Sequence, residues 1–247
     1  MNKPFIASKA NEIRKEVLGD SVPVDVRTIC RHLGIHVTDK PIKSEAYFIS
    51  REGNLAIIVK EDVIEQRKRF SIAHELGHIF LPDHAELVFN CSYNDMLYNT
   101  KKPYEQEANF FASELLIPAE DLISDIRSDI SIDLISQKAK DYFVSLSAMA
   151  IKLTQLTKDA VAVAFIEGNR IKWSSKSDNF GFEVCEGAVD ERSNFRKFGN
   201  DVGLKKVSGV VDSSVWLKGE EEMELREEII RFSEFNCSLV VINPNVD

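Results

Sequence analysis

The chain has 247 residues, of which 44% are hydrophobic, and a formal net charge of −9. That length and apolar content are enough for one large domain or two smaller ones. No apolar run reaches the length of a membrane span, and charges interrupt the apolar residues near the N-terminus, so we expect neither a span nor a secretory signal, and hence a cytoplasmic protein. The negative charge disfavours non-specific binding to nucleic acid but leaves a local basic face possible.

The four cysteines, Cys30, Cys91, Cys185 and Cys237, lie far apart and form no CxxC pair. A chain of this size does not need disulfide bonds to stabilise a small core. We therefore expect reduced thiols that mostly fill the core, and no structural zinc site on cysteine.

The N-terminal part is predicted to pair two helices with a small sheet. Residues 5–19 and 24–33 carry apolar side chains at helical spacing, and each segment ends at or just before a glycine. The segment IHVTD after the second helix alternates like a strand. Residues 46–50 and 55–59 flank the link REGN, whose composition is typical of a hairpin.

Two longer helices are predicted next. Residues 62–81 contain no proline, keep an apolar stripe and are stopped by Pro82. The run HELGH lies inside this helix. Residues 83–102 are rich in turn formers and are predicted to be a connection or a lid, and a second helix is predicted over 103–116, opened by a proline suited to a first helical turn.

The rest of the chain changes from helical to β character near residue 158. Within 134–153, the pattern LISQKAKDYFVSLSAMAIKL resembles a helix-turn-helix. Its second helix carries Lys152 as its only base, which favours a packing module over a reader of DNA bases. Residues 220–235 fit either an acidic helix or a strand.

These elements predict an α+β protein in three parts. Residues 1–118 would form a first domain with a small antiparallel sheet and the helix that contains HELGH. Residues 119–157 would form a helical, helix-turn-helix-like segment, and residues 158–247 a C-terminal β-rich subdomain.

The HExxH run has a direct mechanical meaning. Residues four apart lie on one face of a helix, so His74 and His78 can direct two imidazoles at one Zn²⁺ ion. Glu75 lies beside the metal without binding it. Its carboxylate can take a proton from a water that the metal polarises and later pass it to the leaving amine.

A tetrahedral catalytic zinc needs a third protein ligand, and one candidate is His84. It lies ten residues after His74, the spacing of the third histidine in the metzincin pattern HExxHxxGxxH. The glycine of that pattern is Leu81 here and is followed by Pro82, so the required turn would be strained. If His84 is not a ligand, we expect an exposed loop histidine.

The other candidates are acidic residues of the next helix. Glu105 and Asn109 share one helix face, whereas Glu107 points roughly 160° away from it. This geometry favours Glu105 as the third ligand over Glu107. Asn109 would then accept a hydrogen bond from the remaining ring N–H of His74 and fix its tautomer.

Two motifs together resemble a known family. The run RKRFSIAHELGHIFL (67–81), followed by EQEANFFASELLIP (105–118), is similar to the ImmA/IrrE metallopeptidases, and the resemblance covers roughly residues 5–157. It implies a zincin-like metallopeptidase domain over residues 1–118, with a gluzincin-like zinc site completed by Glu105. Members of this family cleave helix-turn-helix repressors and thereby switch on mobile-element or stress-response genes. No segment before His74 has the pattern of a repressor, so the substrate is expected to be a separate protein.

The sequence therefore predicts a zinc endopeptidase that acts on a helix-turn-helix repressor. The alternative is a non-enzymatic, metal-dependent regulator that binds DNA or a repressor partner, although direct DNA binding is disfavoured. Tyr98, Tyr104 and Tyr142 are three candidates for stabilising the oxyanion of the attacked carbonyl, and the sequence does not choose among them.

Overall fold

A computed structural model describes residues 1–82, 84, 100, 102–123, 126, 129–197, 204–219, 222–232 and 236–244.

The first two helices begin at side-chain caps. Helix α1 (Lys3–Leu18) starts at Asn2, whose side chain accepts a hydrogen bond from a backbone N–H of the first turn, and it ends at Gly19, which has a positive φ of 62°. Helix α2 (Val26–His32) is capped in the same way by Asp25. Both predicted helices are confirmed.

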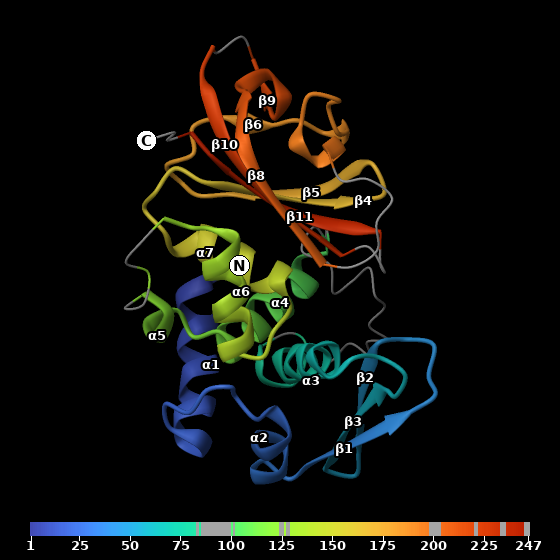
Figure 1. Ribbon diagram of the computed structural model, residues 1–247. Helices are drawn as coiled ribbons and strands as arrows, with labels where there is room; N and C mark the ends of the chain where they lie inside the picture. Colours follow the sequence, from blue (N-terminus) through green and yellow to red (C-terminus); the bar gives the residue numbers. More distant parts are fainter. Residues whose placement is uncertain are drawn as a thin grey trace. The chain divides into compact units, whose positions relative to one another are not determined.

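The small sheet is mixed and not purely antiparallel. Strands β2 (Ala46–Arg51) and β3 (Asn54–Lys60) form the predicted hairpin. Strand β1 (Ile35–Lys40) pairs with β3 in parallel, so the order is β1-β3-β2 (Figure 1). The hairpin places β3 between the other two strands, and the backbone of Glu45 accepts a hydrogen bond from the end of β3. The prediction of an antiparallel sheet is therefore corrected for β1.

Two helices carry the HELGH motif and the motif that begins at Glu105. Helix α3 (Glu65–Phe80) contacts strands β2 and β3, and helix α4 (Pro103–Leu116) packs along α3 and α1. Both helices were predicted, although α3 begins three residues later than expected. Of the predicted connection over 83–102, only residues 84, 100 and 102 lie within the described part of the chain.

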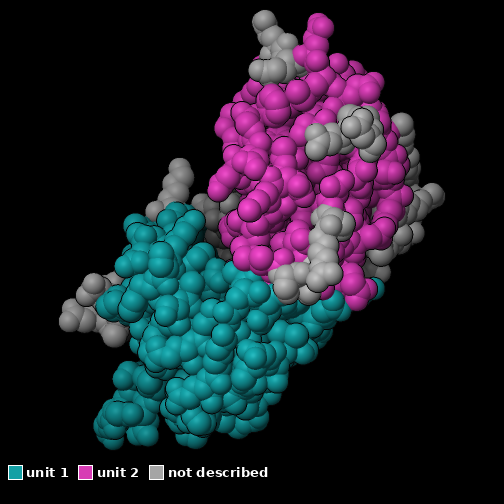
Figure 2. Space-filling model, turned by 90° about the vertical axis from the view of Figure 1, so that its left-hand side faces the viewer, with its two compact units in different colours: residues 1–121, 140–145 teal, residues 122–139, 146–247 magenta. Residues whose placement is uncertain are grey.

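The described residues fall into two compact units (Figure 2). One contains residues 1–121 and 140–145, and the other contains residues 122–139 and 146–247. The predicted boundaries at residues 118 and 157 are not tested by this grouping and stay predictions.

Three further helices follow α4. They are α5 (Ala119–Ile123), α6 (Ile132–Asp141) and α7 (Leu146–Leu156). Helix α7 packs against strands β4 and β5 of the second unit, and the side chain of Lys152 is only 1% exposed. The base expected on this helix therefore does not lie on the surface.

The second unit contains a six-stranded antiparallel sheet. Its order is β7-β5-β4-β11-β10-β8. These strands are β4 (Ala162–Glu167), β5 (Arg170–Lys176), β7 (Gly187–Ala188), β8 (Leu204–Asp212), β10 (Glu224–Phe232) and β11 (Cys237–Asn243). Strands β6 (Glu183–Val184) and β9 (Leu217–Lys218) form a separate pair, and two short 3₁₀ turns, η1 (Asn194–Lys197) and η2 (Ser213–Val215), also lie in this unit. The predicted β-rich C-terminal region is confirmed, and the ambiguous acidic segment contains strand β10.

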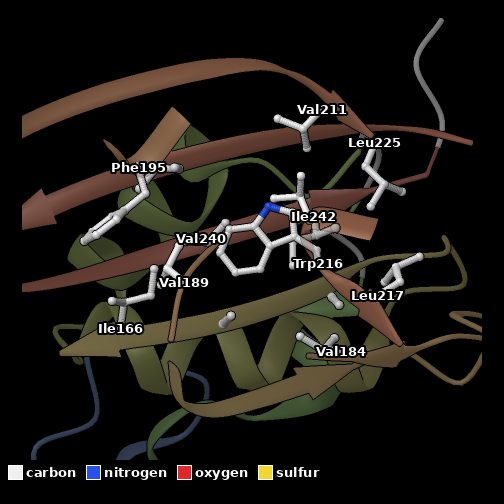
Figure 3. Packing of buried hydrophobic residues seen from close by; sticks show 14 of the residues in the cluster. Ile166, Val184, Val189, Phe195, Val211, Trp216, Leu217, Leu225, Val240 and Ile242 are labelled. Carbon is white, nitrogen blue, oxygen red and sulfur yellow. The ribbon is translucent and has the colours of Figure 1, made fainter. Parts of the chain in front are cut away.

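Trp216 lies in the centre of the core of the second unit (Figure 3). Its indole Nε1 donates a hydrogen bond to Oε2 of Glu227 at 2.6 Å, and the Ser193 hydroxyl donates to the same oxygen at 3.0 Å. The backbone N–H of Asn194 donates to Oε1. This buried carboxylate thus joins η1, β10 and the core tryptophan through satisfied hydrogen bonds.

The described cysteines, Cys30, Cys185 and Cys237, are all free thiols. Cys91 lies outside the described residues. Burial raises the pKa of the Cys30 thiol to about 12. Among the helices of the described residues, none is both long and apolar enough to cross a membrane.

Candidate metal centre

Helix α3 carries three fully buried polar side chains in its last two turns. His74, Glu75 and His78 each have 0% exposed surface. Burial of so many polar groups is costly unless each is matched by a partner or a bound ion. The four-residue spacing places both imidazoles on one face of α3, and their Nε2 atoms are 3.1 Å apart.

Helix α4 brings a carboxylate to these two nitrogens. Oε2 of Glu105 lies 3.1 Å from Nε2 of His74 and 3.5 Å from Nε2 of His78. Together the three atoms form a triangle with sides of 3.1, 3.1 and 3.5 Å. Tetrahedral bonds of about 2.0–2.1 Å would separate neighbouring ligand atoms by roughly 3.3 Å. The donor set and its spacing therefore fit three corners of a tetrahedral metal site, and these residues could hold a metal ion.

A close approach of α3 and α4 sets the position of Glu105. At Gly77, an added Cβ would lie 3.0 Å from Cα and 3.3 Å from Cβ of Ala108. Only glycine allows the two helix backbones to come this near. Gly77 lies between the two histidines, and Ala108 lies one turn after Glu105. This contact therefore sets how far Oε2 of Glu105 lies from the Nε2 atoms of the two histidines.

The electrostatics of Glu105 favour its ionised form. Burial alone would raise the pKa of this carboxyl group, but hydrogen bonds with His74 and His78 outweigh the burial and hold the pKa at about 2. Glu105 is therefore a carboxylate at neutral pH, which is the form that binds a cation.

The second residue of the predicted pair on α4 also lies in place. Oδ1 of Asn109 is 2.9 Å from Nδ1 of His74. With Nε2 of His74 directed at the triangle, Nδ1 carries the hydrogen and donates it to the Asn109 carbonyl oxygen. The amide thus faces the atom that the helix-face argument predicted.

His84 and Glu107, the other two candidate ligands, are not in the triangle of the described residues. Nδ1 of His84 lies 3.1 Å from Nδ1 of His78, on the side of that ring away from Nε2, and its Nε2 lies 3.0 Å from Oε2 of Glu107. His84 is 3% exposed, so the expectation of an exposed loop histidine is wrong. Burial lowers the pKa of His84, and the neighbouring Glu107 only partly offsets this effect.

A buried arginine supports helix α3 from one side. Arg69 donates to the backbone carbonyl of Val24 at 2.7 Å and of Tyr142 at 3.2 Å, and also to that of Phe143. Arg69 belongs to the motif that precedes HELGH. The sequence alone gives it no role, because it does not show which loops lie beside α3. Residue 143 has a positive φ of 50°, so its carbonyl is part of a tight turn that the guanidinium holds.

Of the three candidate tyrosines, Tyr104 lies near the triangle. Its ring centroid is 6.5 Å from that of His78. Tyr142 is 3% exposed, and Tyr98 lies outside the described residues. The role of an oxyanion stabiliser stays a prediction for these residues.

The chain matches the model of the IrrE N-terminal-like domain over residues 30–154, just over half of its length. A search of curated proteins gave no match. Among solved structures, the fold is similar to a "Mycobacterium tuberculosis transcriptional regulator", with a TM-score of 0.61 and 12% sequence identity, over 98% of this chain and 76% of that one. The family match contains both the HELGH helix and the helix of Glu105. This chain belongs to the ImmA/IrrE family, whose model is that of a metal-dependent peptidase domain.

Proposed function

We propose that the protein is a zinc-dependent endopeptidase in which His74, His78 and Glu105 hold the metal. The triangle formed by their Nε2, Nε2 and Oε2 atoms carries this proposal. Two imidazoles and one carboxylate are a donor set of catalytic zinc sites, in which the fourth position is left open.

Zinc at this site would supply a Lewis acid that polarises the scissile carbonyl and lowers the pKa of a nearby water. Glu75, buried on α3 next to His74, is the general base that accepts the proton of the attacking water. It then donates this proton to the amine nitrogen of the cleaved peptide bond, and the oxygen of the water remains on the new carboxyl group. Asn109 holds His74 in the tautomer that leaves its Nε2 lone pair for the metal.

We further propose that the substrate is a separate helix-turn-helix repressor, so that cleavage derepresses genes under its control. The resemblance to the ImmA/IrrE metallopeptidases implies a regulatory protein as the substrate, and the family model matches the part of the chain that carries both motifs. The similar fold described as a transcriptional regulator is compatible with a role in gene control. The burial of Lys152 on α7 favours proteolysis over direct DNA reading.

The test compares Glu75→Gln with Glu61→Gln, a matched change at an exposed residue just before α3. Each purified protein is loaded with zinc and incubated with helix-turn-helix repressors of the same organism, beginning with any that a neighbouring reading frame encodes. Mass spectrometry of the products measures cleavage. We expect one zinc per chain in both variants, native cleavage with Glu61→Gln, and a loss of about 10²–10⁴-fold or more with Glu75→Gln.

Two results would contradict the proposal. Native cleavage by the Glu75→Gln variant would show that Glu75 is not the base. A zinc-dependent shift of DNA by the wild-type protein, with no cleavage of the repressor, would instead identify a non-enzymatic regulator.

A further inference from the structure

A second histidine lies behind one of the two metal-binding imidazoles. Nε2 of His78 faces the triangle, and its other ring nitrogen, Nδ1, is 3.1 Å from Nδ1 of His84. His78 is 0% and His84 3% exposed. The contact therefore lies in a place where an unmatched ring nitrogen would be costly.

The far side of His84 ends on a carboxylate. Its Nε2 lies 3.0 Å from Oε2 of Glu107, a residue of α4 whose side chain is 26% exposed. The other oxygen of Glu107, Oε1, lies 3.5 Å from the ammonium group of Met1. Helix α4 thus carries both Glu105, which faces the triangle, and Glu107, which faces the histidine behind it.

When a metal is bound, the hydrogen bonds that link His78, His84 and Glu107 require one arrangement of protons. Nε2 of His78 must offer its lone pair to the metal, so its hydrogen is on Nδ1. That hydrogen is donated to Nδ1 of His84, which must then be the acceptor nitrogen of a neutral ring. The hydrogen of His84 is consequently on Nε2, where it is donated to the carboxylate of Glu107.

We infer that His84 and Glu107 are positioning residues for His78, as the counterpart of Asn109 behind His74. This inference rests on the proposed metal site. A carboxylate at the end of such a chain fixes the tautomer and the orientation of the ligand ring and raises its basicity, and loss of such a partner commonly weakens metal binding 10–100-fold. Each imidazole of the site is then held by a separate hydrogen-bond partner, and both partners depend on α4.

The test measures zinc affinity, by competition with a chromophoric chelator at fixed pH, for the wild-type protein, His84→Phe and His84→Asn. Phenylalanine keeps most of the ring volume but offers no acceptor to His78. Asparagine places a carbonyl oxygen near the position of Nδ1 and restores the acceptor. We expect His84→Phe to bind zinc 10–100-fold more weakly, and His84→Asn to recover most of that loss.

Two further measurements separate positioning from a general loss of structure. The urea unfolding of each metal-free variant shows whether the fold is retained. The visible spectrum of the cobalt-substituted proteins shows whether the ligand set is retained, and we expect the same band positions in His84→Asn as in the wild-type protein.

The inference is overturned if His84→Phe binds zinc within about twofold of the wild-type protein, or if His84→Asn is as weak as His84→Phe. A wild-type protein that binds two zinc ions, one of which is lost in His84→Phe, would make His84 a ligand and would also overturn it. Glu105→Ala distinguishes the two proposals. If that variant binds zinc as tightly as the wild-type protein, the proposed metal site itself is wrong.

Discussion

The close contact of α3 and α4 predicts a specific defect for Gly77→Ala. The new Cβ would lie 3.0 Å from Cα of Ala108, whereas carbon atoms pack best at about 3.5–4.0 Å. The two helices must therefore separate locally by a few tenths of an ångström. Metal sites tolerate deviations of only about 0.2 Å in ligand distances. Because Glu105 is on the displaced helix, we expect zinc affinity to fall 10–100-fold.

The effect of Gly77→Ala on stability should be smaller, because two terms oppose each other. Alanine is favoured over glycine in a helix interior by about 1 kcal/mol. Overpacking of a close contact costs about 1–3 kcal/mol. The free energy of unfolding of the metal-free protein should therefore fall by no more than about 2 kcal/mol, as measured by urea denaturation followed by circular dichroism.

Two further variants serve as controls for Gly77→Ala. Gly181→Ala adds a Cβ that meets no atom within 4 Å, so it should keep wild-type zinc affinity. Combining Gly77→Ala with Ala108→Gly removes the contact with Cβ of residue 108 at 3.3 Å but keeps the contacts with its backbone Cα at 3.0 Å and backbone oxygen at 3.3 Å, so it should restore little affinity. Wild-type affinity in Gly77→Ala would refute the claim that helix spacing sets the triangle.

Four other predictions follow from the contacts. Asn109→Ala should weaken zinc binding about 10–100-fold through His74, measured with the same chelator. Arg69→Met leaves three carbonyl acceptors without their donor and should lower the free energy of unfolding by about 2–4 kcal/mol. Glu227→Ala removes the acceptor of buried donors that include Trp216 and should cost about 3 kcal/mol or more, with a change in tryptophan fluorescence. The Cys30 thiol, with its pKa raised from 9.0 to about 12, should resist alkylation at pH 8 until the protein unfolds. Because this thiol ionises more readily in the unfolded chain, its contribution to the free energy of unfolding is complete below pH 9 and is lost as the pH rises toward 12.

Helical periodicity carried the prediction of the site. The spacing of His74 and His78 required only that HELGH lie on a helix, and the shared face of Glu105 and Asn109 required only that the second motif lie on another. The structure brings the three candidate ligands together and places Asn109 on His74. Such short-range geometry follows from residue spacing alone.

The contact of His84 with His78 could not be predicted in the same way. It depends on where the chain lies after Pro82, which ends the helical periodicity. The position of Glu107 depends in turn on the packing of α4 against α3. Spacing on one helix gives directions around its own axis, but it does not show which distant side chain fills the space beyond.

Strand β10 illustrates a similar limit in the second unit. Leu225, Glu227 and Ile229 alternate toward the buried face, but a glutamate among the inward positions breaks the apolar alternation that indicates a strand. The partners that make this burial possible, Ser193 and Trp216, are far from strand β10 in the sequence or beyond a turn. A local pattern therefore left helix and strand equally compatible with the segment.

A crystal structure of the zinc-loaded protein, with anomalous data collected on both sides of the zinc edge, would show directly whether the triangle holds the metal. We expect one zinc peak per chain, bound by Nε2 of His74, Nε2 of His78 and a carboxylate oxygen of Glu105, with one position open to solvent. A zinc peak bound elsewhere, or a coordination sphere that lacks Glu105, would contradict this expectation.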